Sequence, residues 1–225
     1  FAPTEEAKQA LVAEGVAGSN IFVTGNTVID ALLYIRDRVR SRPPELPAGL
    51  KSAIDGRQLV LVTGHRRESF GEGFENICKA ILAVAEQFPQ VLFVYPVHLN
   101  PNVREPVNRI LGGHDRIILI EPLPYEPFVW LMDRATLVLT DSGGVQEEAP
   151  SLGKPVLVMR EITERPEGVA AGNARLVGVN RDRIVDSLAQ LLTHPAEREA
   201  MSKVRNPYGD GLASIRIADI LARLS

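Results

Sequence analysis

Short apolar runs alternate with longer amphipathic stretches along most of this chain. In the runs, apolar residues occupy nearly every position, as in strands buried on both faces. They lie at residues 59–63, 91–95, 117–120, 137–140 and 155–159, and a further strand is expected at 174–177. Between the runs, apolar residues recur at the three- and four-residue spacing of helices. This alternation predicts an α/β fold with a doubly wound parallel sheet, Rossmann-like and covered on both faces.

The same spacing places the helices. They are expected at residues 5–14, 27–40, 74–87, 102–111, 125–134, 181–193, 196–203 and 212–224, with another directly after Ser142. Thr4 is a candidate N-cap for the first of them. A short strand is expected at 20–24 and a proline-rich loop at 41–47. The first 40 residues and the last helix fall outside the regular alternation, so we expect them to pack against something outside this chain.

Composition narrows the class of protein. The 225 residues are 45% hydrophobic and carry a net charge of −3, so no basic patch indicates nucleic acid or a membrane surface. No apolar stretch approaches the roughly 20 residues that span a bilayer. Cys78 is the only cysteine, which excludes an internal disulfide and a thiolate zinc cluster; its apolar helical surroundings indicate a buried thiol. A cytoplasmic enzyme fits best. Because the chain opens on Phe1, we expect a fragment.

A glycine-rich turn follows the strand at 137–140. Ser142, Gly143 and Gly144 stand where this strand passes into a helix, so free backbone N–H groups and the helix dipole favour an anion there. Two glycines let a bulky anion approach the backbone closely. Glu148, one turn further along, can accept hydrogen bonds from sugar hydroxyls. The combination suits a nucleotide-sugar diphosphate. The alternative is a turn in which Ser142 only caps the helix and Glu148 is solvated.

Unusual polar residues follow the carboxyl ends of five predicted strands, at 64–68, 96–101, 121–128, 141–144 and 160–165. Ligands of doubly wound sheets bind at that edge, so we expect one nucleotide or phosphosugar cleft there. His65 is expected to stabilise or protonate a leaving diphosphate, since histidine exchanges protons near neutral pH. A solvated ion-pair cluster is the alternative.

Three further candidates keep two interpretations each. His98 either contributes to the cleft or satisfies a backbone carbonyl. Phe128 either closes over a flat base at the cleft mouth or belongs to the core. Arg165 either binds a phosphate or carboxylate through its planar guanidinium or pairs with neighbouring glutamates.

Four motifs carry a resemblance to a known family. They span residues 63–69 (TGHRRES), 95–103 (YPVHLNPNV), 140–150 (TDSGGVQEEAP) and 163–167 (TERPE). In sequence and order they closely resemble the non-hydrolysing UDP-N-acetylglucosamine 2-epimerases of bacteria. The resemblance implies one half of the two-domain GT-B fold. Residues 1–40 would be the inter-domain crossing segment with the first helices. Residues 41–225 would be the C-terminal UDP-binding domain, with helix 212–224 packed on an absent N-terminal domain.

The resemblance also implies an activity and a set of roles. Family members interconvert UDP-N-acetylglucosamine and UDP-N-acetylmannosamine by eliminating and re-adding UDP, without metal or other cofactor. They are expected to be cytoplasmic homodimers serving cell-surface polysaccharide biosynthesis. His65 matches the catalytic histidine near the diphosphate. The substrate-binding positions are Leu123 and Phe128 for uridine, Ser142, Gly143 and Gly144 for phosphate, Glu148 for the ribose hydroxyls, and Arg165. Arg66 and His98 resemble residues that contact a second, regulatory UDP-N-acetylglucosamine.

Two departures from the family limit this expectation. Relatives have a polar residue in place of Leu123, so only its backbone would bind the base. Their first domain also supplies the acidic residues proposed for proton transfer at C2, and we find no carboxylate pair suited to that role here. We therefore expect the chain to bind UDP weakly and not to epimerise by itself. A GT-B glycosyltransferase domain, a hydrolysing epimerase and a non-catalytic nucleotide-sugar-binding module remain alternatives.

Overall fold

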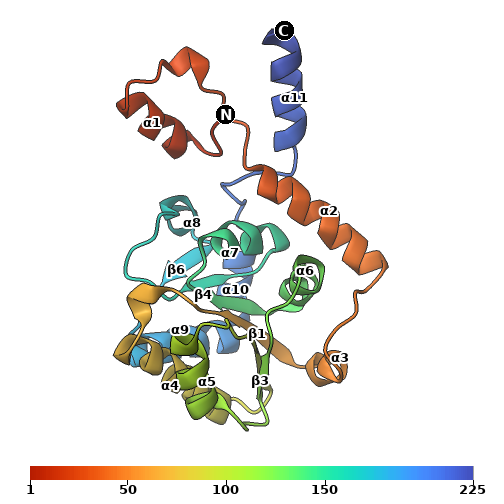
Figure 1. The fold of residues 1–225 in the computed structure, drawn as a ribbon, viewed down its shortest axis with the longest axis vertical. Coiled ribbons are helices and arrows are strands. Elements are labelled where there is room, and N and C mark those ends of the chain that lie inside the picture. Colours follow the sequence, from red (N-terminus) through yellow and green to blue (C-terminus); the bar gives the residue numbers. More distant parts are fainter. Residues whose placement is uncertain (225) are drawn as a thin grey trace.

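A six-stranded, wholly parallel sheet forms the centre of the computed structural model, which describes residues 1–224 (Figure 1). Its strands run in the order β3-β2-β1-β4-β5-β6. They are β1 (Gln58–Thr63), β2 (Val91–Pro96), β3 (Ile117–Ile120), β4 (Leu137–Thr140), β5 (Val156–Val158) and β6 (Ala174–Leu176). Each corresponds to a strand predicted from the apolar runs. The predicted doubly wound, Rossmann-like class is thereby confirmed.

The strand order reverses at the centre of the sheet. From β1 the chain moves outward through β2 to β3, and then returns to the other side of β1 to begin β4. Register is set by pairs such as Val60 with Phe93 and Thr63 with Thr140. In open parallel sheets a crevice forms at the carboxyl ends of the two strands where the order reverses. Here those ends belong to β1 and β4.

Helices cover both faces of the sheet. One face carries α4 (Glu72–Gln87), α5 (Pro101–Leu111) and α9 (Arg181–Thr193), whose buried residues form one core cluster. The other carries α2 (Thr27–Ser41), α3 (Leu50–Ile54) and α6 (Tyr125–Arg134), which contribute to a second cluster. The remaining helical segments are α1 (Glu5–Ala13), η1 (Gly18–Asn20), η2 (Arg67–Ser69), α7 (Gly143–Glu148), η3 (Ala149–Leu152), α8 (Pro166–Ala171), α10 (Pro195–Ser202) and α11 (Ala213–Leu224).

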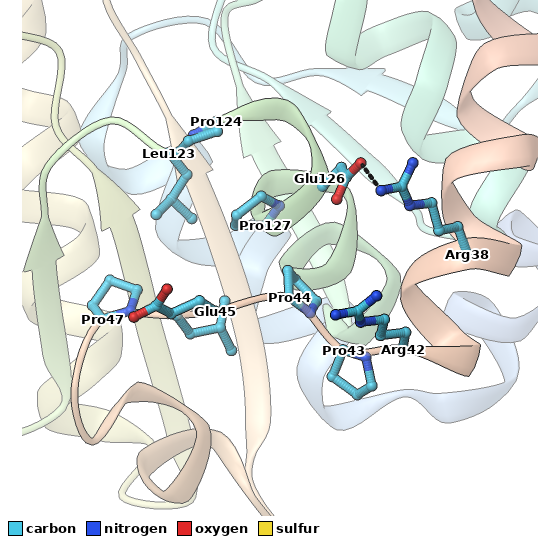
Figure 2. A pocket seen from close by; sticks show the side chains of 11 residues that line it. Arg38, Arg42, Pro43, Pro44, Glu45, Pro47, Leu123, Pro124, Glu126 and Pro127 are labelled. Carbon is cyan, nitrogen blue, oxygen red and sulfur yellow. Dashed lines mark ion pairs between the residues drawn. The ribbon is translucent and has the colours of Figure 1, made fainter.

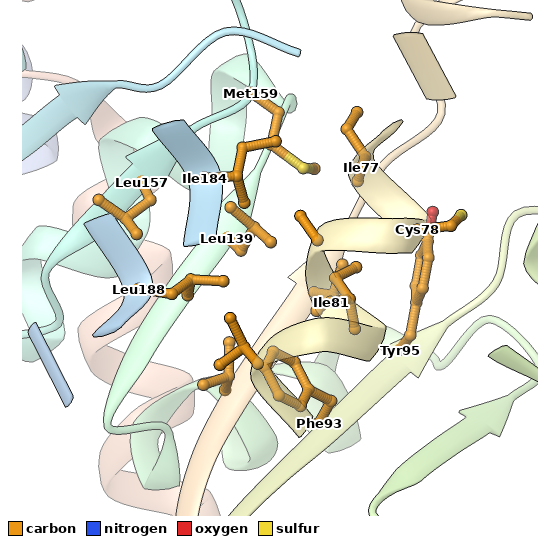
Figure 3. Packing of buried hydrophobic residues seen from close by; sticks show 14 of the residues in the cluster. Ile77, Cys78, Ile81, Phe93, Tyr95, Leu139, Leu157, Met159, Ile184 and Leu188 are labelled. Atoms are coloured by element: carbon orange, nitrogen blue, oxygen red, sulfur yellow. The ribbon is translucent and has the colours of Figure 1, made fainter. Parts of the chain in front are cut away.

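The strands divide their side chains between the two clusters. In β1, Val60 and Val62 join the first cluster while Leu59 and Leu61 join the second, because successive side chains of a strand point to opposite faces. Figure 3 shows the first cluster, with Cys78 among its buried members. Burial raises the pKa of the Cys78 thiol to about 12, so this cysteine is the structural thiol that its helical surroundings predicted.

Some predicted elements differ from the structure. Residues 20–24 do not form a strand: only an isolated bridge joins Val23 to Ala2. The short segment before α1 pairs with residues 20–24 at this one bridge, so these β-forming residues do not extend a ladder of backbone hydrogen bonds. The short helices α3 and α8 were not predicted, since five and six residues are too few to show a helical period. Ser225, the last residue of the predicted second domain, lies outside the described residues.

Helices α1 and α11 stand at one end of the molecule, away from the sheet (Figure 1). Thr4 caps α1 as predicted, accepting the backbone N–H of Ala7. The α11 helix buries only Ala213 and exposes Ile215, Leu221 and Leu224 by 59%, 53% and 68%. Within residues 1–224, no helix combines the length and apolar character needed to cross a bilayer.

Replacing a buried aromatic of the first cluster tests the described packing. Phe93 is completely buried in β2, so Phe93→Ala is expected to lower the free energy of unfolding by about 3–5 kcal/mol. Urea denaturation measures the change. Tyr34→Ala is the control, because Tyr34 is 69% exposed and its loss should cost no more than about 0.5 kcal/mol. Equal losses in the two variants would contradict the packing.

Candidate functional site

The ends of β1 and β4 are joined by the carboxylate of Asp141. Its Oδ2 accepts the backbone N–H groups of His65 and Arg66 at 2.7 and 2.8 Å, and its own backbone N–H donates to the carbonyl of Thr63. The side chain of Asp141 is completely buried. These bonds attach the loop after β1 to the loop after β4 across the point where the strand order reverses.

A second histidine brings the loop after β2 to the same place. The rings of His65 and His98 stack with their centroids 5.4 Å apart and their planes 16° from parallel. Nδ1 of His65 lies 3.4 Å from Oδ1 of Asp141, while 42% of its side chain is exposed. His65 therefore lies at the crevice with a fully buried acidic partner, rather than in the solvated ion-pair cluster considered as its alternative.

The glycine turn opens α7 beside these loops. Ser142 occupies the N-cap position, yet in the described part of the chain its side chain makes no capping hydrogen bond. Its backbone N–H is taken by the hydroxyl of Thr140, so the free N–H groups belong to the first helical positions, Gly143 and Gly144. The structure thus rules out the alternative in which Ser142 acts as a side-chain cap.

Two guanidinium groups flank the first of these glycines. A Cβ atom placed on Gly143 would lie 3.9 Å from Nη2 of Arg66 and 4.0 Å from Nη2 of Arg165. The loops after β1, β4 and β5 therefore converge within a few ångströms of one backbone position. Free N–H groups together with two guanidinium forks are a chemical set that binds phosphate.

Glu148 lies at the other end of α7 and is buried, with 7% of its surface exposed. Its Oε1 accepts the hydroxyl of Tyr125 at 2.5 Å, and its Oε2 lies 4.0 Å from a Cβ placed on Gly144. Burial raises the pKa of the Glu148 carboxyl, and the hydrogen bond from Tyr125 opposes that rise. Burial and Glu148 together raise the pKa of the Tyr125 phenol. The solvated glutamate considered as an alternative is therefore wrong.

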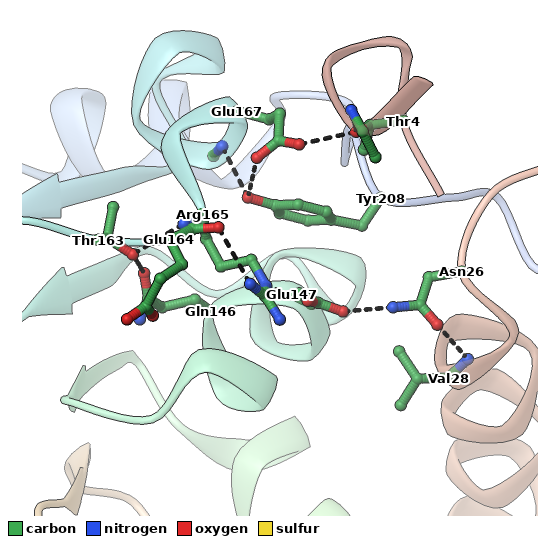
Figure 4. A network of polar contacts seen from close by, with 12 residues as sticks. Thr4, Asn26, Val28, Gln146, Glu147, Thr163, Glu164, Arg165, Glu167 and Tyr208 are labelled. Atoms are coloured by element: carbon green, nitrogen blue, oxygen red, sulfur yellow. Dashed lines mark hydrogen bonds and ion pairs between the residues drawn. The ribbon is translucent and has the colours of Figure 1, made fainter. Parts of the chain in front are cut away.

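Arg165 is held by a carboxylate from another element (Figure 4). Its Nε donates to Oε1 of Glu147, whose Oε2 accepts the side-chain amide of Asn26 at 2.5 Å. Asn26 also caps α2 by accepting the N–H of Val28. Glu147 is 6% exposed, so a buried acid connects the start of α2 to the arginine beside the glycine turn.

A separate ion pair lies next to Arg165. Arg160 binds Glu164 through two hydrogen bonds of 2.7 and 2.9 Å, and this contact lowers the pKa of the Glu164 carboxyl to about 2. Glu164 is also 3.9 Å from Arg66. The neighbouring glutamates were one of the two interpretations of Arg165. The Glu164 carboxylate pairs with Arg160, while Arg165 donates to the backbone carbonyl of Glu164.

Leu123 and Phe128 lie to one side of this cluster. Both are half-buried and pack against the second core cluster. Leu123 lines a groove of about 760 Å³ between α6 and the loop that follows α2, shown in Figure 2. Tyr125, at the start of α6, connects this region to α7 through its bond to Glu148. Phe128 therefore packs against the second core cluster and keeps part of its surface exposed.

Three residues of this cluster had no predicted role. Asp141 was visible in the sequence only as part of the strand end, Glu147 as one of two adjacent glutamates, and Tyr125 as a loop aromatic. For Asp141 a signal did exist, since an acid at the buried end of a strand requires donors.

Within residues 1–224, no three His, Cys, Asp or Glu side chains gather as a candidate metal site.

The strand order and the polar crevice where that order reverses define a Rossmann-like α/β protein with a candidate anion-binding site. The family is equally clear: the model for UDP-N-acetylglucosamine 2-epimerase matches residues 1–222, and the chain belongs to this family. The resemblance found in the four motifs is thereby confirmed.

Similar proteins agree. The UDP-N-acetylglucosamine 2-epimerase of Escherichia coli K12 is 58% identical over 224 residues, which cover 98% of this chain and 60% of that protein. The Neisseria meningitidis UDP-GlcNAc 2-epimerase, solved bound to UDP-GlcNAc, has a TM-score of 0.93 at 46% identity, covering 99% of this chain and 61% of that one. A Staphylococcus aureus protein solved with UDP has a TM-score of 0.92 at 42% identity, covering 100% and 60%.

The same relatives allow the fold and the length of this chain to be compared. Structural neighbours have the GT-B architecture, which confirms the predicted fold class. The chain spans about 60% of the length of the curated relatives that it matches.

Replacing Glu147 tests the connection to Arg165. Glu147→Ala removes the acceptor of Arg165 Nε and of the Asn26 amide, and is expected to lower the free energy of unfolding by about 2 kcal/mol. Chemical denaturation measures the loss. The matched control is Glu164→Ala, which removes an exposed ion pair and should cost clearly less than Glu147→Ala. Equal losses of unfolding free energy in the two variants would contradict the proposed importance of the Glu147 contacts.

Proposed function

We propose that the crevice binds the UDP part of a UDP-N-acetylhexosamine, and that the protein interconverts UDP-N-acetylglucosamine and UDP-N-acetylmannosamine. The convergence of Arg66 and Arg165 on Gly143 carries this proposal, because it forms an anion site where the strand order reverses. Membership of the family and the UDP-GlcNAc bound to the Neisseria relative support the choice of nucleotide sugar.

Each group of the crevice has a proposed role. The N–H groups after Ser142, at Gly143 and Gly144, receive the diphosphate with Arg165. Glu148 accepts the ribose hydroxyls as a carboxylate. The backbone at Leu123 and the ring of Phe128 contact uridine. Packing of Phe128 against the second core cluster fixes the position of its ring.

His65 is the proposed catalytic residue of this chain. Elimination breaks the bond between C1 and the diphosphate oxygen, and the C2 proton leaves to a base. His65 stands at the crevice, where it stabilises or protonates the departing diphosphate. The reverse addition, after a proton returns to the other face of C2, gives the epimer. The base for C2 is proposed to lie outside this chain, in a domain against which α11 packs.

A second nucleotide sugar is proposed to contact Arg66 and His98. Because the His98 ring stacks on His65, a ligand there would lie next to the reacting one, which offers a direct physical route for regulation. The homodimer and the cytoplasmic location remain predictions from the family resemblance.

UDP titration with a Glu148 variant tests the nucleotide site. Glu148→Gln retains the shape of the side chain but loses the charged acceptor, so UDP affinity should fall about 10- to 100-fold. Isothermal calorimetry on the 225-residue chain measures it. Unchanged affinity would contradict the role of Glu148 and would favour a module with another ligand.

The pH dependence follows from the raised pKa of Glu148. Ribose hydroxyls favour the ionised form of Glu148, so wild-type UDP affinity should fall as the pH drops through that pKa, in addition to any change from the phosphate itself. The Gln variant should show only the change from the phosphate.

The same raised pKa affects stability. Since the folded state binds the Glu148 proton more tightly than the unfolded chain does, the stability that Glu148 contributes is present at low pH and lost as pH rises. Glu148→Gln should therefore be no less stable than wild type at neutral pH.

Hydrogen exchange at C2 separates epimerisation from glycosyl transfer. In D₂O, an epimerase places deuterium at C2 of UDP-N-acetylglucosamine, whereas glycosyl transfer leaves C2 untouched. The 225-residue chain alone is expected to bind UDP without exchanging C2, and the Escherichia coli relative is the positive control. Deuterium incorporation by the chain alone would show that it holds its own base. Continuous release of free UDP would indicate a hydrolysing enzyme.

A further inference from the structure

The two carboxylate oxygens of Asp141 have different surroundings. Oδ2 accepts two backbone N–H groups, from His65 and Arg66. Oδ1 is buried and has no hydrogen-bond partner among the described residues, yet it lies 3.4 Å from Nδ1 of His65. Leaving a buried acceptor unpaired is unfavourable, so the position of Oδ1 calls for an explanation.

The orientation of the His65 ring supplies one. The two ring nitrogens lie on different edges of the imidazole, so a ring that turns Nδ1 toward Asp141 turns Nε2 away from the carboxylate. One face of the ring is covered by His98, with a centroid separation of 5.4 Å. An acid at one edge and an aromatic ring on one face restrict rotation about the side-chain bonds. The side chain of His65 remains 42% exposed.

We propose that Asp141 is a positioning residue that holds the proton of His65 on Nδ1 and directs Nε2 into the crevice. The Nδ1–H bond then faces the carboxylate whether the ring is neutral or charged. All proton exchange then passes through Nε2. When the ring is charged, Nε2–H gives its proton to an oxygen of the leaving diphosphate and Nε2 becomes bare. On re-addition the same proton returns. This last part rests on the proposed function, whereas the position of the proton in the unbound chain does not.

A purely structural role for Asp141 makes a different prediction. If the carboxylate only held the loop after β1, Asp141→Asn would be equivalent, because the amide oxygen still accepts both backbone N–H groups. Those two donors require an acceptor at the Oδ2 position, so the NH₂ group of the asparagine must face Nδ1 of His65. An NH₂ group is a donor, and it favours a ring with bare Nδ1 and protonated Nε2. The variant therefore keeps the loop and reverses the tautomer.

Long-range ¹H–¹⁵N spectra of the 225-residue chain with labelled histidine detect this difference. The chain has four histidines, and His65→Gln assigns the signals of His65. Spectra are recorded at a pH where the rings are neutral. We expect Nδ1–H in the wild type and predominantly Nε2–H in Asp141→Asn. Asp133→Asn is the matched control, since that carboxylate pairs with Arg40 on α2, and it should leave His65 unchanged.

The outcomes are separable. Bare Nδ1 in the wild type overturns the proposal without any variant, so the test stands even if Asp141→Asn fails to fold. A folded Asp141→Asn chain that keeps Nδ1–H also overturns it and assigns Asp141 a structural role. A parallel UDP titration distinguishes the two proposals. Failure of the wild type to bind UDP contradicts the proposed function alone, while UDP binding with an unchanged tautomer in the variant contradicts the positioning role alone.

Discussion

Parallel pairing of β1 with β4 on one side and with β2 on the other is the constraint on which the rest of this molecule depends. Parallel strands place all their carboxyl ends at one edge, and reversal of the order at β1 separates the helices that cover the two faces. Loops that are far apart in the sequence therefore meet there. His65, Gly143 and Arg165 come from three such loops and lie together without any direct sequence relationship.

The crevice is built from buried acids, each with its own donors. Asp141 takes backbone N–H groups from the neighbouring loop, Glu147 takes Arg165 and Asn26, and Glu148 takes the Tyr125 hydroxyl. Burying carboxylates opposes folding unless such partners are present. Because these acids lie beside the glycine turn, they hold acceptors and guanidinium groups in fixed positions. Burial still raises the pKa of Glu148, although Tyr125 donates a hydrogen bond to it.

Besides the packing of α2 on the sheet, polar side-chain bonds connect the first 40 residues to this crevice. Asn26 binds Glu147, and Thr4 donates to Glu167 on α8, which also accepts the hydroxyl of Tyr208 (Figure 4). A displacement of this segment would therefore strain the contacts of Arg165. This arrangement suits a segment proposed to cross between domains. The bonds from Asn26 to Glu147 and from Arg165 to Glu147 would transmit a displacement of the segment to the anion site.

The sequence by itself determined the strands, most helices and the edge at which the ligand groups gather. Short continuous apolar runs that alternate with helices are typical of strands covered on both faces, and motifs at their ends were enough to indicate the family. Only the tertiary structure decided which partners the polar side chains take. Glu164 is adjacent to Arg165 in the sequence, yet Arg165 binds Glu147, and Phe128 packs against the core. The carboxylate of Asp141 joins β1 to β4 through donors 75 and 76 residues away. Such pairings depend on distance in space and on burial, which a linear pattern of residue types does not encode. The isolated bridge at Val23 shows the same limit, since a strand needs a partner that its own residues do not specify.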